Sequence, residues 1–488
     1  MKIKIIGAAG GEVTGSAYVV QTRHASVLVD AGMFQGGKQC ETKNRLPSGA
    51  RPDQLDAVLL THAHLDHTGR LPLLIKHGYT GPVYTTRATL DLAEIILKDA
   101  AKIQLQDAER ANRKRDRAGK EPVEPLYGPE HVEPFRELAR PVDFRRPVRV
   151  AEGITARWVE AGHMLGSGSI ELTVEEDGNR KVVVFSGDLG PKSLPIIRQF
   201  DLLQQADLVF LESTYGNREH RPYAETVAEF EEIVKRVSRN NGKILVPTFA
   251  IGRSQQILYH LAVLFRQKKV KPFPVYLDSP MAIQASRVFV KHPELFDEEL
   301  AEWTRRGLLP LDPQYFKACA SVDDSRKLNG VSGPCAILAG AGMCNAGRIL
   351  HHLKENLWRS ETHVLIVGYQ GHGSLGRLLV DGAKFVGVLG ERLAVRAAIH
   401  TLNGFSAHAG QSDLLRWFEA LAPSKPRVIM THGEDPAREA LSQLIRQRFR
   451  LQCELPGLGD VIELQEHQVT ASAANVPGGR DARKMESA

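Results

Sequence analysis

At 488 residues the chain is too long for one ordinary hydrophobic core, and its length predicts two or three domains. Hydrophobic residues make up 42% and charged residues 25% of the chain, as in ordinary globular proteins, and no apolar run is long enough to span a membrane. The net charge of +6 is small for this length, so the distribution of the basic residues is more informative than their excess.

The N-terminal residues 1–7 are predicted to form the first strand, and they lack the long apolar core of a signal peptide. The cysteines are odd in number and contain no CxxC pair, so we interpret them as reduced thiols. Both observations favour a cytoplasmic protein. The cysteines are Cys40, Cys319, Cys335, Cys344 and Cys453.

A cluster of metal-binding side chains follows the apolar run 57–60, which is predicted to be a buried strand. The chain then places His62, His64, Asp66 and His67 at spacings that do not stack on one helix face. A tight loop at a strand end can turn all four toward one point, where imidazole and carboxylate ligands suit zinc. The ligands split into a histidine pair for one ion and Asp66 with His67 for a second. A His-rich surface loop is the alternative, and the density of the motif argues against it.

A long amphipathic helix is predicted over residues 88–117, and basic side chains cluster at its end. These side chains form either a solvated helix end or a phosphate-contacting rim for a polyanionic substrate. The basic residues of this segment are Arg110, Arg113, Lys114, Arg115, Arg117, Lys120, Arg136, Arg140, Arg145, Arg146 and Arg149.

From residue 244 onward a pattern of strand, Gly-rich turn and helix is repeated, which predicts parallel strands with helices on both faces. Helix N-termini at such turns bind phosphate. We therefore consider Arg253, Ser374 and Arg377, each beside such a turn, as candidate substrate contacts, with a surface or helix-capping role as the alternative for each. The end of the chain is small and polar, and we expect a disordered tail over residues 465–488.

The cluster at residues 62–67 resembles the signature of the metallo-β-lactamase superfamily, and the chain also contains matches to the further motifs of that family. The family has a lone His in a Gly-rich loop, an Asp that bridges two metals after a strand, and a last His after a late strand. Three residues match these positions in order: His163, Asp188 and His432. Asp30, at the end of an early strand, matches an Asp that supports a ligand without touching metal.

The long interval between Asp188 and His432 predicts a domain-sized insertion, and the chain from about residue 1 to 460 then resembles the β-CASP ribonucleases. Motif A of that branch matches Glu212, motif B matches His408 in the sequence Phe-Ser-Ala-His, and motif C matches His432. The likeness is to bacterial and archaeal relatives of the endonuclease subunit of the eukaryotic pre-mRNA 3′-end cleavage factor. A His at motif C favours RNA over DNA as the substrate.

The resemblance implies an α/β fold, namely a metallo-β-lactamase αββα sandwich with an inserted β-CASP cap domain of parallel strands flanked by helices. The expected division is residues 1–212 for the first part of the core, 213–392 for the cap and 393–464 for the returning part of the core. A cleft between core and cap would hold single-stranded RNA. We also expect a homodimer and no association with a membrane.

The resemblance implies two zinc ions per chain, with manganese as an alternative metal. The first ion is assigned to His62, His64, His163 and Asp188, and the second to Asp66, His67, His432 and the shared Asp188. Asp66 would also orient the attacking water, and His408, kept protonated by Glu212, would protonate the leaving oxygen. The alternatives are a structural His408 packed under the cap and a surface ion pair for Glu212.

We predict a zinc-dependent ribonuclease that acts in RNA processing or decay, cuts endonucleolytically and leaves 5′-phosphate and 3′-hydroxyl ends. A 5′-to-3′ exoribonuclease is an alternative within the same branch. A hydrolase of the tRNase Z, glyoxalase II or lactonase type is disfavoured by the long insert and the Ser-Ala-His motif. A metal-free, RNA-binding scaffold subunit is disfavoured because all seven ligands are present.

Overall fold

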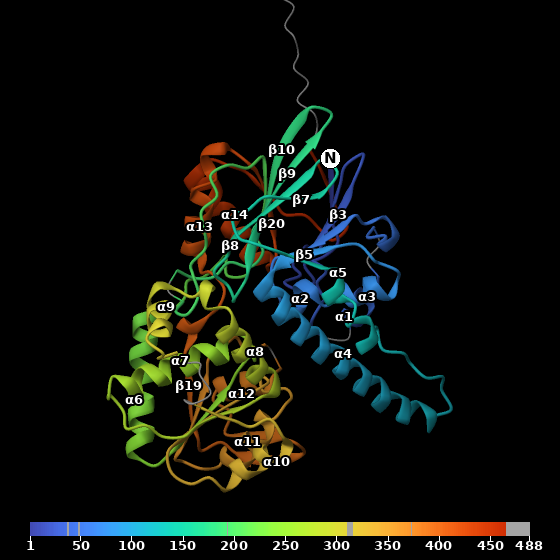
Figure 1. Ribbon diagram of the computed structural model, residues 1–488. Helices are drawn as coiled ribbons and strands as arrows, with labels where there is room; N and C mark the ends of the chain where they lie inside the picture. Colours follow the sequence, from blue (N-terminus) through green and yellow to red (C-terminus); the bar gives the residue numbers. More distant parts are fainter. Residues whose placement is uncertain (37–38, 47–48, 193, 310–315, 372, 465–488) are drawn as a thin grey trace, which may run out of the picture.

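The computed structural model describes residues 1–36, 39–46, 49–192, 194–309, 316–371 and 373–464. Figure 1 shows an upper part built from the two ends of this chain, the core, and a lower part built from its middle, the insert. The expected disordered tail, residues 465–488, lies outside the described residues. Within the described ranges no helix combines the length and the apolar character needed to cross a membrane.

The first core sheet has the strand order β22-β1-β2-β3-β4-β5-β6. Its strands β3 to β6 run parallel, so their carboxyl ends lie at one edge, whereas β1 and β2 pair in antiparallel fashion. The strands are β1 (Lys2–Ile5), β2 (Tyr18–Gln21), β3 (Ser26–Val29), β4 (Ala57–Leu59), β5 (Val83–Thr86), β6 (Ala139–Val142) and β22 (Val461–Glu463).

The second core sheet has the strand order β21-β20-β11-β10-β9-β8-β7. Its strands β10, β11 and β20 run parallel, and β7 to β10 form an antiparallel meander. The strands are β7 (Val148–Ala151), β8 (Ile154–Glu160), β9 (Gly168–Glu176), β10 (Asn179–Phe185), β11 (Leu208–Glu212), β20 (Arg427–Thr431) and β21 (Cys453–Glu454).

The two core sheets face each other across a hydrophobic layer. Because side chains alternate along a strand, Val183 and Phe185 of β10 lie between the sheets, whereas Val184 joins the cluster under the outer helices α13 and α14. Helices α3 and α4 cover the other sheet. The predicted αββα sandwich is therefore confirmed. The core helices are α1 (Gln39–Lys43), α2 (Leu65–Thr68), α3 (Leu71–Lys76), α4 (Arg87–Asp116), α5 (Phe135–Leu138), α13 (Gln411–Glu419) and α14 (Asp435–Phe449).

The long helix predicted from the sequence is α4, and its basic end projects from the core (Figure 1). The Thr86 side chain caps its start by accepting a hydrogen bond from the Thr89 amide (3.2 Å). Near its end, the Asn112 side chain exchanges two hydrogen bonds with the backbone of Val123 (2.7 and 2.9 Å), which holds the returning chain against the helix. The basic cluster at residues 110–120 therefore lies on a mostly exposed arm.

The insert is built on a six-stranded sheet in which all pairs are parallel, with the order β14-β13-β15-β12-β16-β19. In β12, Ile244 and Val246 join the cluster of α6, α7 and α8, whereas Leu245 joins that of α11 and α12 on the opposite face. The predicted parallel sheet with helices on both faces is confirmed. The strands are β12 (Lys243–Pro247), β13 (Val275–Asp278), β14 (Lys317–Ala318), β15 (Cys335–Ala339), β16 (Thr362–Ile366) and β19 (Ala398–Thr401).

Short elements complete the insert. Its helices are α6 (Tyr223–Arg239), α7 (Arg253–Arg266), α8 (Pro280–Lys291), α9 (Glu298–Arg305), α10 (Val322–Lys327), α11 (Ile349–Asn356) and α12 (Leu375–Val380). A separate antiparallel hairpin is formed by β17 (Phe385–Val388) and β18 (Glu391–Ala394).

Strand pairing bears on where the insert ends. The division expected from the sequence closed the cap at residue 392, but β19 pairs in parallel with β16 of the inserted sheet, with His400 opposite Leu365. We propose from this pairing that the insert extends to about Thr401 and that the chain returns to the core after it.

Ion pairs join the insert to the core. Asp91 of α4 accepts hydrogen bonds from Lys291 Nζ (2.6 Å) and His292 Nε2 (2.9 Å) at the end of α8. Arg136 of the core contacts the other oxygen of the same carboxylate at 2.9 Å. The carboxylate of Asp91, on α4 of the core, therefore connects the core to the insert.

Candidate functional site

Parallel strands of the second sheet bring three candidate residues together. β10, β11 and β20 end side by side, with Phe185 opposite Phe210 and Glu212 opposite Thr431. Asp188 lies just beyond the end of β10, and His432 directly follows β20. Because carboxyl ends of adjacent parallel strands share one edge, these residues meet Glu212 there.

The first sheet delivers the remaining ligands to the same place. β3 and β4 are parallel, with Val29 opposite Leu59, so Asp30 and the segment at residues 61–67 leave the sheet together. This segment is a loop only up to His64, and Asp66 and His67 lie in the short helix α2. His163 arrives on the connection between the antiparallel strands β8 and β9. The site therefore forms where both sheets of the sandwich end.

The structure brings together the atoms of the first predicted ligand set. His64 Nδ1 lies 3.2 Å from His62 Nε2 and 3.1 Å from His163 Nε2. Asp188 Oδ2 lies 3.4 Å from His62 Nε2 and 3.6 Å from His163 Nε2. These separations are close to the edges of a tetrahedron of zinc ligands, about 3.3–3.6 Å for bonds of the usual length. The four residues can thus hold one metal ion.

The second set is grouped in the same way. His67 Nε2 lies 3.1 Å from His432 Nε2, and Asp66 Oδ2 lies 3.7 Å from the same nitrogen. Asp188 Oδ1 lies 3.3 Å from His67 Nε2 and 3.4 Å from His432 Nε2. Asp66, His67 and His432 form a second potential metal cluster. Asp188 therefore directs one carboxylate oxygen at each set.

The Asp188 carboxylate also tests whether metal ions fit the site. Its Oδ1 atom is buried and has no hydrogen-bond partner among the described residues. An ionised oxygen in that position is costly unless a cation neutralises it. The donors around it are imidazole nitrogens and carboxylate oxygens, which are ligands that zinc takes. The residues present therefore fit metal ions.

Outer hydrogen bonds orient two of the ligand rings. His163 Nδ1 lies 2.9 Å from the Ala407 carbonyl oxygen and donates its hydrogen to it. His67 Nδ1 donates in the same way to Asp30 Oδ2 at 2.7 Å. Because Nδ1 carries a hydrogen in both rings, Nε2 is the atom of each ring that faces the cluster and can bind metal.

Asp30 contacts a candidate ligand, and its supporting role stays a prediction. Besides His67, it accepts hydrogen bonds from the Thr61 amide (2.8 Å) and the Thr61 hydroxyl (2.9 Å). Asp30 and His432 both have positive φ, 57° and 52°. Such backbone conformations are uncommon for residues with side chains and are found more often at functional sites.

Burial sets the charge state of the first set. It lowers the pKa of His62 and His163. Burial, with the neighbouring His62, lowers the pKa of His64 to about 3. The three imidazoles are therefore neutral, which is the form that binds metal.

The second set differs in charge before metal binding. Burial acts to lower the pKa of His67 and His432, but the neighbouring carboxylates together outweigh it, and the pKa of both rings is raised. These carboxylates are Asp188 and Asp30 for His67, and Asp188 and Asp66 for His432. Metal binding at this set would therefore displace protons.

The Glu212–His408 pair lies against the metal cluster. His408 Nδ1 is 3.6 Å from Glu212 Oε1, an ion-pair contact longer than a hydrogen bond, and 3.9 Å from Asp188 Oδ2. Burial lowers the pKa of His408, but the contact with Glu212 and the Asp188 charge outweigh it and raise the pKa to about 9. Glu212 is only 1% exposed and accepts hydrogen bonds from two backbone amides, so it is not a surface ion pair.

The predicted substrate contacts are in different surroundings. Arg253 is buried at the start of α7, whereas Ser374 caps α12 by accepting a hydrogen bond from the Arg377 amide at 3.0 Å. Arg377 donates to the Asp381 carboxylate at 2.9 Å. The structure thus gives Ser374 and Arg377 the capping and surface contacts named as alternatives, and their contact with substrate stays a prediction.

Sequence reasoning missed two side chains at the site. Thr61 contacts Asp30, His62 and His67, and its position just before the first ligand was the only signal for it. The Tyr215 ring lies 6.0 Å from the His408 ring, and it occurs three positions after Glu212 in the motif A segment. Thr61 thus contacts predicted residues of the ligand cluster, and Tyr215 adjoins the predicted residue His408.

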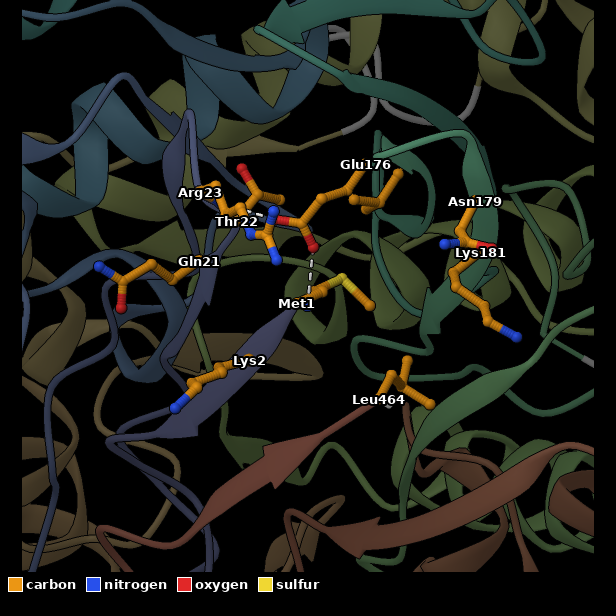
Figure 2. A pocket seen from close by; sticks show the side chains of 10 residues that line it. Met1, Lys2, Gln21, Thr22, Arg23, Glu176, Asn179, Lys181 and Leu464 are labelled. Atoms are coloured by element: carbon orange, nitrogen blue, oxygen red, sulfur yellow. Dashed lines mark hydrogen bonds and ion pairs between the residues drawn. The ribbon is translucent and has the colours of Figure 1, made fainter. Parts of the chain in front are cut away.

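A hollow at the other end of the sandwich has no such chemistry. It has a volume of about 450 Å³ and lies between the starts of β1 and β10 and the end of β9, whereas Asp188 lies beyond the opposite end of β10 and His163 lies before the opposite end of β9. Figure 2 shows its main polar contact, in which the Met1 ammonium donates to Glu176 Oε2 at 2.8 Å. No predicted site residue lines it. The metal cluster is therefore the candidate site.

Three family models match successive parts of the chain. The Metallo-beta-lactamase superfamily matches residues 10–215, the Beta-Casp domain matches residues 254–379, and the Zn-dependent metallo-hydrolase RNA specificity domain matches residues 392–456. The first and last matched segments contain every proposed metal ligand, and the middle one lies within the inserted sheet and its helices.

Two proteins and one solved structure are similar over most of the chain. Ribonuclease TTHA0252 of Thermus thermophilus is 41% identical over 92% of this chain and 96% of its own. Transcription termination factor FttA of Methanocaldococcus jannaschii is 30% identical over 95% of this chain and 72% of its own. A protein of unknown function from Enterococcus faecalis shares the fold at 14% identity, with a TM-score of 0.55 over 95% of this chain and 99% of that one. With its metal cluster and inserted sheet, the chain belongs to the β-CASP ribonucleases of the metallo-β-lactamase superfamily.

Proposed function

We propose that the chain hydrolyses single-stranded RNA endonucleolytically with two zinc ions and leaves 5′-phosphate and 3′-hydroxyl ends. The observation that carries this proposal is Asp188, which offers one oxygen to each of two ligand sets. A pair of metals sharing a carboxylate is suited to phosphodiester hydrolysis, in which charge grows on both the attacking and the leaving oxygens.

The chain's own residues would hold the ions and aim the reactants. His62, His64 and His163 would hold the first ion, and Asp66, His67 and His432 the second, with Asp188 between them. When bound, the ions supply Lewis acidity that activates water and neutralises charge on the phosphate. Asp66 is the more exposed of the two carboxylates in these sets, so its second oxygen can accept a hydrogen bond from the attacking water.

Departure of the ribose 3′-oxygen requires a proton. His408 is placed for this task because it borders Asp188 on the metal side and Glu212 on the other. Its raised pKa of about 9 keeps the ring protonated at neutral pH. A hydrogen bond from the His220 side chain (Nε2) to the His408 carbonyl (2.8 Å) further fixes this segment. His408 therefore acts as the general acid in the proposed mechanism.

Arg253 is the best-supported of the three predicted contacts with the RNA backbone. It is 8% exposed, and its Nε atom has no hydrogen-bond partner in the described part of the chain. Burial lowers the pKa of its guanidinium to about 10, so it stays charged at neutral pH. A buried cation with an unused donor, close to Tyr215, is suited to a phosphate oxygen.

Circular RNA distinguishes the proposed activity from its alternatives. The zinc-loaded protein should open a single-stranded RNA circle, and mass spectrometry should find 5′-phosphate and 3′-hydroxyl ends on the product. Prior removal of metal with a chelator should abolish opening. An enzyme that degrades only linear RNA from its 5′ end would contradict endonucleolytic cleavage, and one that cuts no RNA would contradict the proposed function.

The homodimer expected from the resemblance stays a prediction. Light scattering during size-exclusion chromatography should give twice the mass of one chain if it is right, and the mass of one chain if it is wrong.

A further inference from the structure

An exposed aromatic side chain lies at the carboxyl edge of the inserted sheet. Phe249, on the connection between β12 and α7, is 47% exposed. β12 is flanked by β15 and β16, so the loops that follow all three strands meet at this edge. An exposed aromatic ring at such a place is unfavourable in water unless it has a partner.

Two glycines make room for this ring. A Cβ atom on Gly342, which follows β15, would lie 2.9 Å from two ring carbons of Phe249. A Cβ atom on Gly368, which follows β16, would lie 3.4 Å from a ring carbon. The Phe249 ring therefore packs against the backbone of both neighbouring loops on one side. The rest of the ring is exposed to solvent.

A second aromatic ring belongs to the same edge. Tyr369 directly follows Gly368 and is 58% exposed. Phe249 and Tyr369 thus present two rings on adjacent loops, and we refer to this pair as the aromatic edge. Its rings are exposed although large apolar groups elsewhere in the inserted sheet are buried.

Contacts connect the aromatic edge to the metal centre. The Phe249 carbonyl accepts a hydrogen bond from the Ser254 hydroxyl at 2.8 Å, which ties it to the first turn of α7. Arg253, in that same turn, lies close enough to Tyr215 for each charge to affect the other. Tyr215 in turn adjoins the general acid His408. Figure 1 shows α7 in the half of the insert nearer the core.

We propose that the aromatic edge stacks on the nucleobases of single-stranded RNA whose backbone runs past Arg253 to the metal centre. This inference rests on the proposed function and adds a contact with bases to it. Aromatic faces stack on every base, so the aromatic edge would provide affinity without sequence preference. In this proposal Arg253 binds the phosphates of the RNA, and the aromatic edge binds its bases.

A cycle of protein and RNA changes tests the stacking directly. The affinity of wild type and Phe249→Ala is measured by fluorescence anisotropy with a metal-free protein and two oligonucleotides, one intact and one with abasic sugars. We expect Phe249→Ala to weaken binding of the intact RNA about tenfold and of the abasic RNA hardly at all. Phe249→Trp should retain the affinity, because a larger ring still stacks.

The matched control is Phe385→Ala. Phe385 is 56% exposed on the β17–β18 hairpin, where Arg392 lies over its ring at 4.7 Å, and its removal should leave both affinities unchanged. Tyr369→Ala should give a smaller effect of the same kind as Phe249→Ala. Equal loss of affinity for intact and abasic RNA, or no loss for either, would overturn the inference while RNA cleavage by the wild type upholds the proposed function. A wild type that neither binds nor cleaves RNA would overturn both.

Discussion

The core and the insert both place their informative residues beyond the carboxyl ends of parallel strands, but these residues are buried in the core and exposed in the insert. In each, parallel strands end at a common edge and the loops beyond them carry the informative residues. In the core these loops are buried and bring together acids and histidines such as Asp188 and His432. In the insert they are rich in glycine and expose rings such as Phe249. Burial is needed to fix metal ligands, whereas exposure is needed to meet a long and variable substrate.

Replacing the Asp188 carboxylate, which both ligand sets of the core share, should have the largest effect on zinc binding and RNA cleavage. Asp188→Asn takes the shared charge from both ligand sets, so we expect zinc loss and a fall of at least about 10³-fold in kcat/KM for RNA. Zinc content by plasma mass spectrometry and RNA cleavage measure the two effects. Asp177→Asn, in the exposed β9–β10 turn, is the matched control and should behave like wild type. Full zinc content with full activity in Asp188→Asn would contradict the bridging role.

Replacing the general acid should lower activity without removing metal. We expect His408→Gln to reduce kcat by about 10²–10⁴-fold while zinc content stays unchanged. Because the ring must be protonated, wild-type activity should decline as pH rises through about 9, and this decline should be absent from the residual activity of the variant. The exposed His351→Gln serves as the control. Unchanged kcat in His408→Gln would assign the proton to another group.

Weakening the support of one ligand should have an intermediate effect. Asp30→Asn removes the carboxylate that orients His67, so we expect zinc affinity of the second set to fall about 10–100-fold. Excess zinc should restore most of the activity, which a loss of the fold would not allow. Competition with a fluorescent chelator measures the affinity, and the exposed Asp53→Asn is the control. An unchanged affinity in Asp30→Asn would remove its supporting role.

The smallest predicted effect concerns the link between core and insert. Asp91→Asn removes a partly exposed ion-pair centre, so we expect a loss of about 1 kcal/mol or less in the free energy of unfolding. The hydrogen bond to Asp91 raises the pKa of His292, so the stabilisation from that pair is complete below pH about 6.5 and is lost as pH rises through the raised value. The difference in Tm between wild type and variant should therefore be larger at pH 6 than at pH 9. Equal differences would show that His292 does not contribute.

Much of the candidate ligand cluster could be predicted from the sequence, because residues such as Asp188 and His432 stand just beyond the carboxyl ends of strands. Parallel pairing then brings such residues together, as Glu212 and His432 show. The end of the insert could not be placed in this way, because β19 (Ala398–Thr401) has only half-buried residues and no clear apolar alternation. Its proposed place in the insert therefore depends on its pairing with β16. Sequence also could not separate Arg253, which is buried beside the site, from Arg377, which forms a surface ion pair, since both stand beside a Gly-rich turn.

Titration of the metal-free protein with zinc tests the central claim most directly. Bound zinc and RNA cleavage are measured together as zinc is added. The account predicts that both rise in parallel and level off at about two ions per chain, as a shared carboxylate between two ligand sets requires. Full cleavage by the metal-free protein, or activity that is complete when one ion is bound, would contradict it.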